Sequence, residues 1–300
     1  MRFVKRSYPR EETPVHLQDM LKIKDFDKVL LGDTSKINDK IYRRDNSDQK
    51  TREALAAYYL GKCAYCENNE YEAQIEHYRP TGKSRKDGGH EGYPWLCYEW
   101  SNLLPSCHDC NRGGAKGTRF PILGIRVAHY PLTDEGSPNT DAFKVNHTLM
   151  LAEKPMLLHP EIDNPRHFFK FDSEGKIFGT DTSARGNKTS EICRLFRQNL
   201  CVARQRIVDD VLDRVRNHLL LFESDHLDKQ GLSAALEQIF IEMKEKAYDI
   251  KESFTLFRWY FFEHFPDLFS DGFHQKLPSL PDDYLQSILN VYTDFRHSQS

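Results

Sequence analysis

The chain has 300 residues, of which 39% are hydrophobic, 29% charged and 12% aromatic, and its net charge is −3 at pH 7. This composition is typical of a globular protein with enough chain for one large domain or two to three smaller ones. No apolar run approaches the roughly 20 residues of a membrane span. The basic start MRFVKRSYPR lacks the apolar stretch of a signal peptide. We therefore expect a cytoplasmic protein without membrane association.

The first sixty residues predict an extended segment followed by a helix. Residues 1–15 are interrupted by prolines, whereas residues 45–60 repeat apolar side chains at helical spacing. Asn46 or Ser47 can cap this helix, and Gly61 can end it because glycine readily adopts the left-handed conformation that closes a helix. The helix would lead directly into the first of two cysteine pairs.

Two Cys-x-x-Cys pairs are the strongest chemical signal in the chain. Cys63 and Cys66 form the first pair, and Cys107 and Cys110 form the second. The two-residue spacer lets both thiolates of a pair bind one ion, so the two pairs together predict a closed, tetrahedral, structural zinc site. A redox dithiol is one alternative, but the pattern lacks its thioredoxin-like βαβ context. Coincidence is the other. The remaining cysteines are expected to be buried as small apolar residues: Cys97, Cys193 and Cys201.

The segment that holds these pairs predicts a ββα unit. Residues 71–78 alternate like a short strand, residues 102–106 can form a second strand, and a short helix runs from the second cysteine pair to near Gly117. Such a small unit buries little apolar surface, which gives a zinc ion a physical role as a staple.

The residues enclosed by the cysteines supply what phosphodiester hydrolysis needs. His77 is the natural base, because the ordinary pKa of histidine lies near neutrality. Glu76 and Asn111 offer hard oxygen ligands to Mg²⁺ or Mn²⁺, and Asn102 can hold the His77 ring. Neighbours on a strand point to opposite faces, so Glu76 and His77 share a site only if the strand ends there, which Pro80 favours. Each residue has a common structural role, and the prediction rests on their order between the cysteines.

Basic residues near this unit predict contacts with nucleic acid. Residues 77–126 hold eight Lys or Arg against four Asp or Glu, and residues 185–216 show the same excess. Such a surplus can follow a phosphate backbone, and a solvated surface explains it almost as well. We expect Lys116 and Arg112, about one turn along the helix after the second cysteine pair, and Arg79 to contact phosphate.

The rest of the chain divides into a mixed segment and a helical region. Residues 122–186 are rich in Pro, Gly and Asp, and 167–171 with 176–178 predict a hairpin. From residue 187 the apolar spacing becomes helical, and Pro266 is expected to stop this run of helices after residue 264. The expected helices are 187–219, 231–250, 252–264 and 283–296. They predict a bundle, with the aromatic residues 254–262 in its core.

The enclosed motifs carry a resemblance. Over residues 63–121 the order Cys-x-x-Cys, Glu-His-x-x-Pro, Asn-Leu, Cys-x-x-Cys-Asn and Lys resembles the HNH endonucleases of the His-Me finger class, in their zinc-stapled ββα-metal form. Residues 153–165, the hairpin and the helix from Asn187 are similar to the HNH family found in Septu-type and retron-associated antiphage systems. In that family the HNH protein works beside an ABC-type ATPase.

The resemblance implies an α+β fold, in which a small zinc-stapled ββα-metal module is embedded in a mostly helical chain with a C-terminal helical bundle. It makes His77 the general base and Asn102 the residue that orients it. Glu76 and Asn111 become ligands of a catalytic Mg²⁺ or Mn²⁺, and the four cysteines become ligands of one structural Zn²⁺. Many HNH enzymes have Asp at the position of Glu76, and several have His at that of Asn111. The expected segments are 1–60, the nuclease module 61–121, 122–186, and a helical region 187–300 that docks a partner.

We therefore expect a metal-dependent HNH endonuclease, acting on DNA in preference, as the effector of an antiphage defence system. The expected partners are nucleic acid and an ABC-type ATPase, with the reverse transcriptase of a retron complex as a further candidate. One alternative is an RNA- or tRNA-cleaving HNH nuclease, since nothing in the pattern reads base edges or a 2′-hydroxyl. The other is a catalytically silent, zinc-stapled scaffold that binds nucleic acid. A scaffold needs only the cysteines, so His77 and its neighbouring metal ligands speak against it.

Overall fold

The computed structural model describes residues 1–38, 49–86, 89–112, 114–180, 184–277 and 280–299. Contacts divide the chain into two units. Unit 1 comprises Met1–Phe168 and Gly179–Leu195, and unit 2 comprises Phe169–Phe178 and Phe196–Ser300. These boundaries cut across the predicted segments 122–186 and 187–300, because most of the hairpin belongs to the helical unit and residues 187–195 belong to unit 1.

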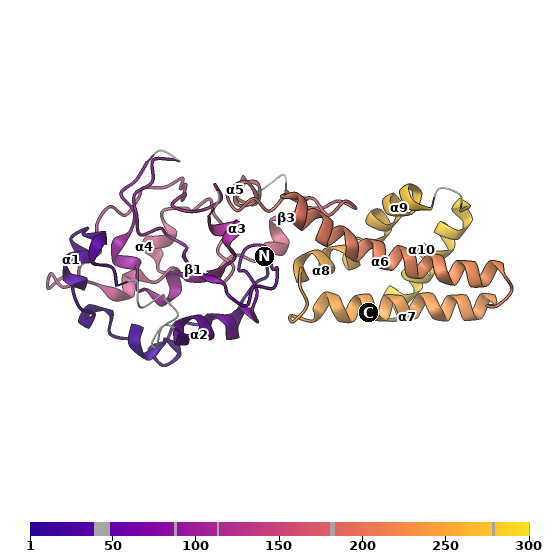
Figure 1. The fold of residues 1–300 in the computed structure, drawn as a ribbon, viewed down its shortest axis with the longest axis horizontal. Helices are drawn as coiled ribbons and strands as arrows, with labels where there is room; N and C mark the ends of the chain where they lie inside the picture. Colours follow the sequence, from indigo (N-terminus) through magenta and orange to yellow (C-terminus); the bar gives the residue numbers. More distant parts are fainter. Residues whose placement is uncertain (39–48, 87–88, 113, 181–183, 278–279, 300) are drawn as a thin grey trace. The chain divides into compact units, whose positions relative to one another are not determined.

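Unit 1 consists of short elements joined by long irregular segments (Figure 1). In chain order the elements are η1 (Arg10–Glu12), η2 (Val15–Leu17), η3 (Met20–Lys22), α1 (Phe26–Leu30), η4 (Thr34–Lys36), α2 (Gln49–Tyr59), β1 (Gln74–His77), η6 (Pro94–Leu96), η7 (Trp100–Asn102), β2 (Leu103–Ser106), α3 (His108–Asn111), η8 (Thr140–Phe143), α4 (Thr148–Leu151), η9 (Pro165–His167) and α5 (Ala184–Ile192). With so little regular structure, unit 1 must satisfy many backbone and charged groups by individual contacts.

The helix and the two strands expected before the second cysteine pair are all present. α2 ends where predicted: the Gly61 N–H donates to the Ala56 carbonyl over 3.0 Å, and Gly61 has a φ of +66°. The predicted caps Asn46 and Ser47 lie outside the described residues. β1 and β2 are antiparallel, with Glu76 opposite Leu104 and His77 opposite Leu103. α2 packs against β2 and α3 against β1, which completes a hairpin followed by a helix.

The helix after the second cysteine pair is shorter than predicted. α3 ends at Asn111, and Arg112 already has an extended backbone. Beyond it the chain folds back, since the Lys116 N–H donates to the Cys110 carbonyl and the Gly117 N–H to the Asn111 carbonyl. Lys116 is therefore on a returning loop and not on the helix.

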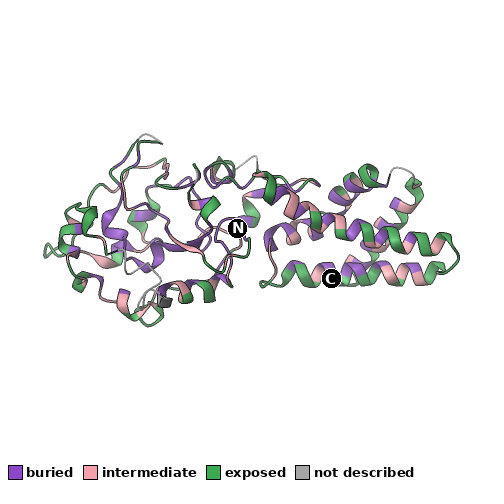
Figure 2. Ribbon diagram, in the orientation of Figure 1, coloured by how far each residue is buried: buried purple, intermediate pink, exposed green. Residues whose placement is uncertain are grey.

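Unit 2 is a helical bundle with a small hairpin (Figure 1). Its elements are β3 (Phe169–Phe171), β4 (Ile177–Gly179, whose last residue is assigned to unit 1), α6 (Gln198–Glu223), α7 (Lys229–Tyr248), α8 (Thr255–Glu263), α9 (Phe265–Lys276) and α10 (Asp282–Ser298). The predicted hairpin, the three helices 231–250, 252–264 and 283–296, and the aromatic core are confirmed. Each long helix buries one side and exposes the other (Figure 2), as the apolar spacing requires.

Two predictions about the helices are wrong. The long helix from residue 187 is interrupted between α5 and α6, because Arg194 has a left-handed φ of 52° and the Leu195 N–H closes on the Ser190 carbonyl over 2.9 Å. Phe196, in the break between the two helices, is 54% exposed although a single helix with this apolar spacing would bury it. Pro266 does not stop the helical run but lies in the first turn of α9, where its missing N–H has no intrahelical partner to lose.

Among the residues that the structure describes, no helix combines the length and the apolar character needed to cross a membrane.

Candidate zinc cluster and active site

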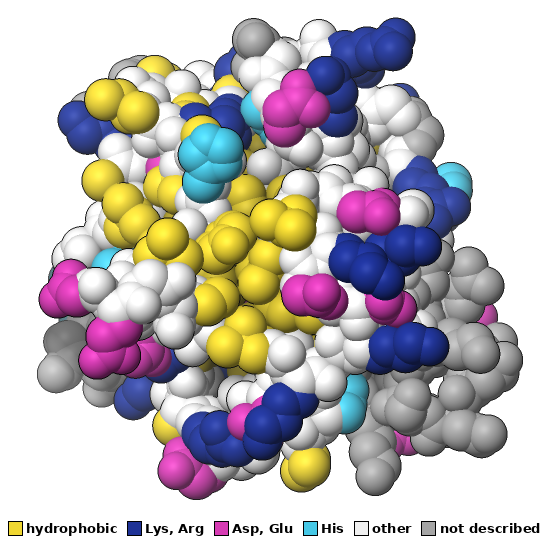
Figure 3. Space-filling model, turned by 90° about the vertical axis from the view of Figure 1, so that its left-hand side faces the viewer, with side chains coloured by type: hydrophobic (Ala, Val, Ile, Leu, Met, Phe, Trp, Pro, Cys, Tyr) yellow, Lys and Arg dark blue, Asp and Glu magenta, His cyan; other side chains and the backbone are white. Residues whose placement is uncertain are grey.

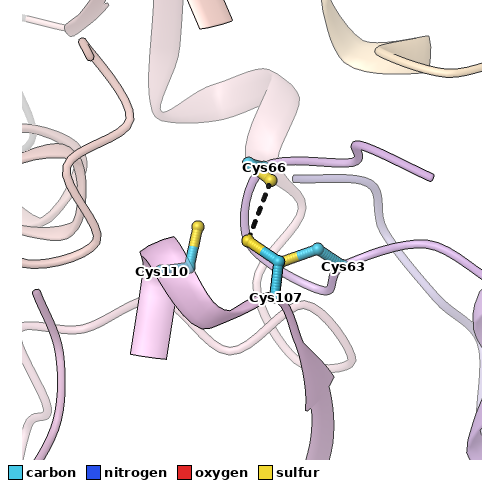
Figure 4. A group of neighbouring side chains, drawn as sticks. All are labelled: Cys63, Cys66, Cys107 and Cys110. Atoms are coloured by element: carbon cyan, nitrogen blue, oxygen red, sulfur yellow. Dashed lines mark hydrogen bonds between the residues drawn. The ribbon is translucent and has the colours of Figure 1, made fainter. Parts of the chain in front are cut away.

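The four predicted cysteines come together in unit 1 (Figure 4). All are buried, and their sulfur atoms lie within 4.8 Å of one another. The Cys66 and Cys107 sulfurs are 3.8 Å apart. Four thiolates about 2.3 Å from a central Zn²⁺ in a tetrahedron have sulfur–sulfur distances of about 3.8 Å. The donor set and its dimensions are therefore compatible with a structural zinc site. We call these four residues the cysteine cluster.

Backbone hydrogen bonds shape the two halves of the cysteine cluster. In the first, the Cys63 carbonyl accepts from the Glu67 N–H, and Glu67 has a left-handed φ of 63°. In the second, the Cys107 carbonyl accepts from the Cys110 N–H over 3.2 Å as α3 begins. The Ala64 N–H donates to the Pro105 carbonyl, which ties the first turn to β2. The cysteine cluster thus fastens α2, β2 and α3 together.

The thiols of the cysteine cluster do not ionise equally. Burial opposes ionisation of Cys63, but hydrogen bonds from the other thiols outweigh it and hold the pKa of the Cys63 thiol well below its usual value. Hydrogen bonds with the same neighbours, together with burial, raise the pKa of the Cys110 thiol well above its usual value. Four thiolates can therefore coexist here only with a cation among them, which is the condition that bound zinc meets.

β1 ends at His77, as the sequence suggested, but Glu76 and His77 still point to opposite faces of the strand, so this arrangement does not bring the pair into the one site that we expected. His77 is half-buried, and its Nε2 lies 3.0 Å from the Cys97 carbonyl oxygen. A carbonyl can only accept, so Nε2 carries the proton and Nδ1 is the unprotonated nitrogen of the neutral ring. The contact thus fixes both the ring orientation and the tautomer of the candidate base.

Asn102 is 1% exposed and acts on the backbone around the candidate base. Its Oδ1 accepts from the Arg79 N–H over 2.8 Å, and its Nδ2 donates to the Arg79 and Leu96 carbonyls over 3.0 and 3.2 Å. The predicted direct hold on the His77 ring is instead provided by Cys97, which sequence reasoning missed. Asn102 thus binds the backbone of Arg79, two residues after His77, and of Leu96, which precedes Cys97.

Glu76 lies on the other face of β1 and is paired with Lys116. Both side chains are almost fully buried, at 5% and 0% exposed. The Lys116 ammonium contacts the Glu76 carboxylate and also donates to the His77 carbonyl over 2.7 Å. Burial raises the pKa of the Glu76 carboxyl, and the Lys116 ammonium offsets part of this effect. The carboxylate expected to bind a divalent cation is therefore already neutralised by a lysine.

Asn111 reaches the same face of β1 from the end of α3. Its Nδ2 donates to Gln74 Oε1 over 3.3 Å, and Gln74 is two residues before Glu76. Side chains two apart on a strand share a face, so Asn111, Glu76 and Lys116 gather on one side of β1, opposite His77.

The three predicted phosphate contacts differ in accessibility. Arg112 is exposed at the end of α3. Arg79 is 1% exposed, its Nε pairs with Glu153 over 2.8 Å, and its Nη2 donates to the Met150 carbonyl. Lys116 is buried against Glu76. Arg79 and Lys116 would have to leave buried ion pairs to reach a phosphate.

Residues 153–165, the second motif of the sequence, contact two residues next to the candidate site, Tyr78 and Arg79. Glu153 accepts from Arg79 and, over 2.8 Å, from the Tyr93 hydroxyl. The His159 ring packs edge-on against Tyr78 with a centroid distance of 4.5 Å. Burial, with the nearby charges of Arg6 and Arg79, holds the pKa of His159 well below its usual value. The motif thus secures the two residues that follow His77.

No protein-family model matches the chain. It is 28% identical over 176 residues to the Septu protein PtuB of Bacillus mycoides (strain KBAB4), which covers 55% of this chain and 52% of that protein. It is 31% identical over 201 residues to the Septu protein PtuA of the same strain, covering 64% of this chain and 25% of PtuA. The chain thus spans about half of the first relative and a quarter of the second.

The Septu protein PtuB of Bacillus thuringiensis is 31% identical over 240 residues, which is 72% of this chain and 81% of that protein. At this identity and coverage, the chain belongs to the Septu PtuB family.

Proposed function

We propose that this chain is an HNH-type endonuclease of the ββα-metal, His-Me finger class, and the effector of a Septu antiphage defence system. The observation that carries the proposal is the fixed His77 ring at the end of β1, inside a hairpin and helix fastened by the cysteine cluster. Membership of the Septu PtuB family supports the role in antiphage defence.

His77 is the proposed general base. Its Nδ1 takes a proton from the water that attacks phosphorus, and the ring becomes an imidazolium. The P–O bond to the leaving oxygen breaks, and that oxygen takes up a proton from solvent. The Cys97 carbonyl then accepts a charge-assisted hydrogen bond from Nε2, which stabilises the charged ring. A positioned base of this kind contributes roughly 10²- to 10⁴-fold to the rate.

The cysteine cluster would hold one Zn²⁺, whose contribution is structural because four thiolates leave no position for water or substrate. Bound zinc fixes α3 and β2 and thereby the register of β1, which sets the position of His77. The proposal assigns no reaction step to this ion.

The catalytic Mg²⁺ or Mn²⁺ implied by the resemblance fits the residues only in part. The oxygens of Glu76 and Asn111 are of the type that both ions prefer. In the arrangement shown, however, Glu76 is paired with the buried Lys116 ammonium, so these residues do not accommodate a divalent cation as placed. The proposed mechanism therefore uses His77 as its base and assigns no step to the cation.

Nucleic acid is the proposed substrate, with DNA preferred, although one face of the chain, in its described residues, carries no uniform basic patch. Figure 3 shows one face of the chain, where hydrophobic side chains gather in the centre and Lys and Arg alternate with Asp and Glu around them. Part of the basic excess at residues 185–216 is used internally: Arg204 donates to the Gly175 carbonyl, and Arg214 pairs with Glu242. The exposed Arg112 near the candidate site remains the proposed phosphate contact.

A second Septu protein is the proposed partner, in the role of the ABC-type ATPase. The comparisons support a pairing, because they match Septu proteins of two kinds, PtuA and PtuB, and this chain belongs to the PtuB family. The helices of unit 2 carry no assigned chemistry and are the proposed docking region for the partner.

The test is a cleavage assay with the full-length, zinc-loaded chain, alone and with its cognate PtuA. Plasmid, single-stranded DNA and tRNA are each incubated with Mg²⁺, with Mn²⁺ and with a chelator too weak to remove zinc. The proposal expects cleavage of DNA that requires added metal. Cleavage of tRNA alone would identify an RNA nuclease. No cleavage under any condition, with nucleic-acid binding retained, would identify the silent scaffold and overturn the proposal.

A further inference from the structure

The surroundings of Lys116 are those of a bound cation. Its ammonium contacts the Glu76 carboxylate, the His77 carbonyl over 2.7 Å and the Gly117 carbonyl over 3.3 Å. One carboxylate and two backbone carbonyls are hard oxygen donors, the ligand type that Mg²⁺ and Mn²⁺ take in proteins. The lysine ammonium thus stands in a position that suits a metal ion.

Charge balance favours either the lysine ammonium or a divalent cation at this position, and not both. Glu76 and Lys116 are almost fully buried and sum to zero. The other side chains placed on this face of β1, Asn111 and Gln74, are amides without charge. A divalent cation added beside the lysine would leave two positive charges that no side chain named on this face of β1 compensates, which is unfavourable in a buried site. With the lysine displaced, the surplus is one positive charge, which a single phosphodiester group can neutralise.

The backbone on either side of Lys116 is fixed. The Lys116 N–H donates to the Cys110 carbonyl over 3.1 Å, and the Gly117 N–H donates to the Asn111 carbonyl over 2.7 Å. The ammonium can therefore be released by rotation of the flexible side chain while these two backbone hydrogen bonds stay in place. The released ammonium would then be available to a phosphate.

From these observations we infer that Lys116 occupies the proposed cation position beside Glu76 in the resting protein, so that a divalent cation binds to Glu76 only by displacing the lysine. This inference rests on the proposed function, since it takes Glu76 as a metal ligand. It deepens that function, because a phosphodiester that compensates the added charge would favour metal entry. Metal loading and substrate binding would then be coupled.

The test measures Mn²⁺ binding in the absence of nucleic acid, so it does not depend on cleavage. Full-length, zinc-loaded protein is titrated with Mn²⁺, and free Mn²⁺ is followed by electron paramagnetic resonance. Lys116→Met removes the ammonium, and Lys116→Gln removes the charge but keeps an amide that can donate to the two carbonyls. We expect both variants to bind one Mn²⁺ roughly tenfold or more tightly than the unmodified chain. Without the lysine, the buried Glu76 carboxylate has lost its positive partner, and a bound cation would replace it.

Lys116→Gln keeps the test decisive if Lys116→Met does not fold. The matched control is Lys116→Gln combined with Glu76→Gln, which should lose the gain in Mn²⁺ affinity. Unchanged or weaker Mn²⁺ binding in every folded single variant would overturn the inference, as would a gain that persists in the double variant. A failure of the nuclease proposal would show separately, as absence of cleavage by the unmodified chain.

Discussion

Both units bury aromatic side chains, but unit 1 also buries ion pairs and a cluster of metal-binding residues, whereas the core of unit 2 is built mainly from packed rings. In unit 1 the pairs Arg79–Glu153 and Arg6–Glu161 have side chains at most 1% exposed. In unit 2 the rings of Phe240, Phe265 and Tyr292 pack with centroid distances of 4.7 to 5.2 Å. Aromatic packing stabilises a helical bundle without fixing any reactive group. Buried polar pairs contribute less net stability but hold backbone and side chains in one geometry, which a base such as His77 requires.

The change with the largest expected effect is loss of the cysteine cluster, which should affect one unit and not the other. We expect Cys110→Ser, or removal of zinc by a strong chelator, to unfold much of unit 1 while the helices of unit 2 stay folded. Structural zinc contributes on the order of 10 kcal/mol in small zinc domains. Hydrogen exchange read peptide by peptide should show lost protection in β1 and β2 and retained protection in α6 and α7. Cys201→Ser in unit 2 is the matched control, and this variant should keep the zinc ion of the cysteine cluster. Equal protection of β1 with and without zinc would contradict the structural role of the ion.

The next effect concerns the buried ion pair behind the site. Arg79→Met leaves Glu153 buried and unpaired, and we expect a loss of about 3–5 kcal/mol in the unfolding free energy of unit 1. Adding Glu153→Gln removes the stranded charge and should recover part of the loss. Urea denaturation with hydrogen exchange assigns the change to unit 1. A double variant no more stable than Arg79→Met would show that the arginine acts through packing and its bond to Met150.

A loss of similar size in unit 2 should follow from Phe240→Ala, because Phe240 is fully buried among other rings. We expect about 3–5 kcal/mol from the lost burial and the cavity left behind. Zinc content and the protection of β1 should not change. Leu220→Ala, which truncates a side chain that is 49% exposed on α6, is the control and should cost little. A shift of zinc content in Phe240→Ala would show that the two units do not fold separately.

The smallest effect is a dependence on pH that belongs to unit 1. Burial lowers the pKa of His159, so the folded state keeps the ring neutral while the unfolded state takes up a proton below about pH 6.5. The stability contribution is thus present above that pH and is lost as the pH falls, at up to about 1.4 kcal/mol per pH unit. His159→Asn keeps an acceptor for the Glu161 N–H but cannot titrate. Between pH 7.5 and 5.5, at equal zinc content, the unmodified chain should lose more stability than this variant. Parallel losses would assign the pH dependence to other groups.

The parts of the fold that could be predicted are those marked by particular residue types or by their spacing in the sequence. The cysteine spacing led to the cysteine cluster, alternation led to β1 and β2, and Gly61 marked the end of α2. The break between α5 and α6 has no such signature, because Arg194 adopts a left-handed φ while the apolar spacing continues on both sides.

In the candidate site, the positions along the chain were predictable and the contacts were not. The Cys97 carbonyl that holds His77 belongs to the backbone, which every residue has. The pairing of Lys116 with Glu76 follows from a helix that stops at Asn111 and a chain that turns back. Glycine at position 114, with a φ of +85°, was the signal in the sequence that could have shortened this helix.

The central claim is that His77 performs the chemistry inside a structure that the cysteine cluster holds. Its most direct test is the cleavage rate of His77→Ala on the nucleic acid that the unmodified chain cleaves, with zinc content and thermal unfolding measured on the same sample. The account predicts a rate lower by roughly 10²- to 10⁴-fold, with one zinc per chain and an unchanged melting temperature. Full cleavage by a folded, zinc-loaded His77→Ala protein would contradict it.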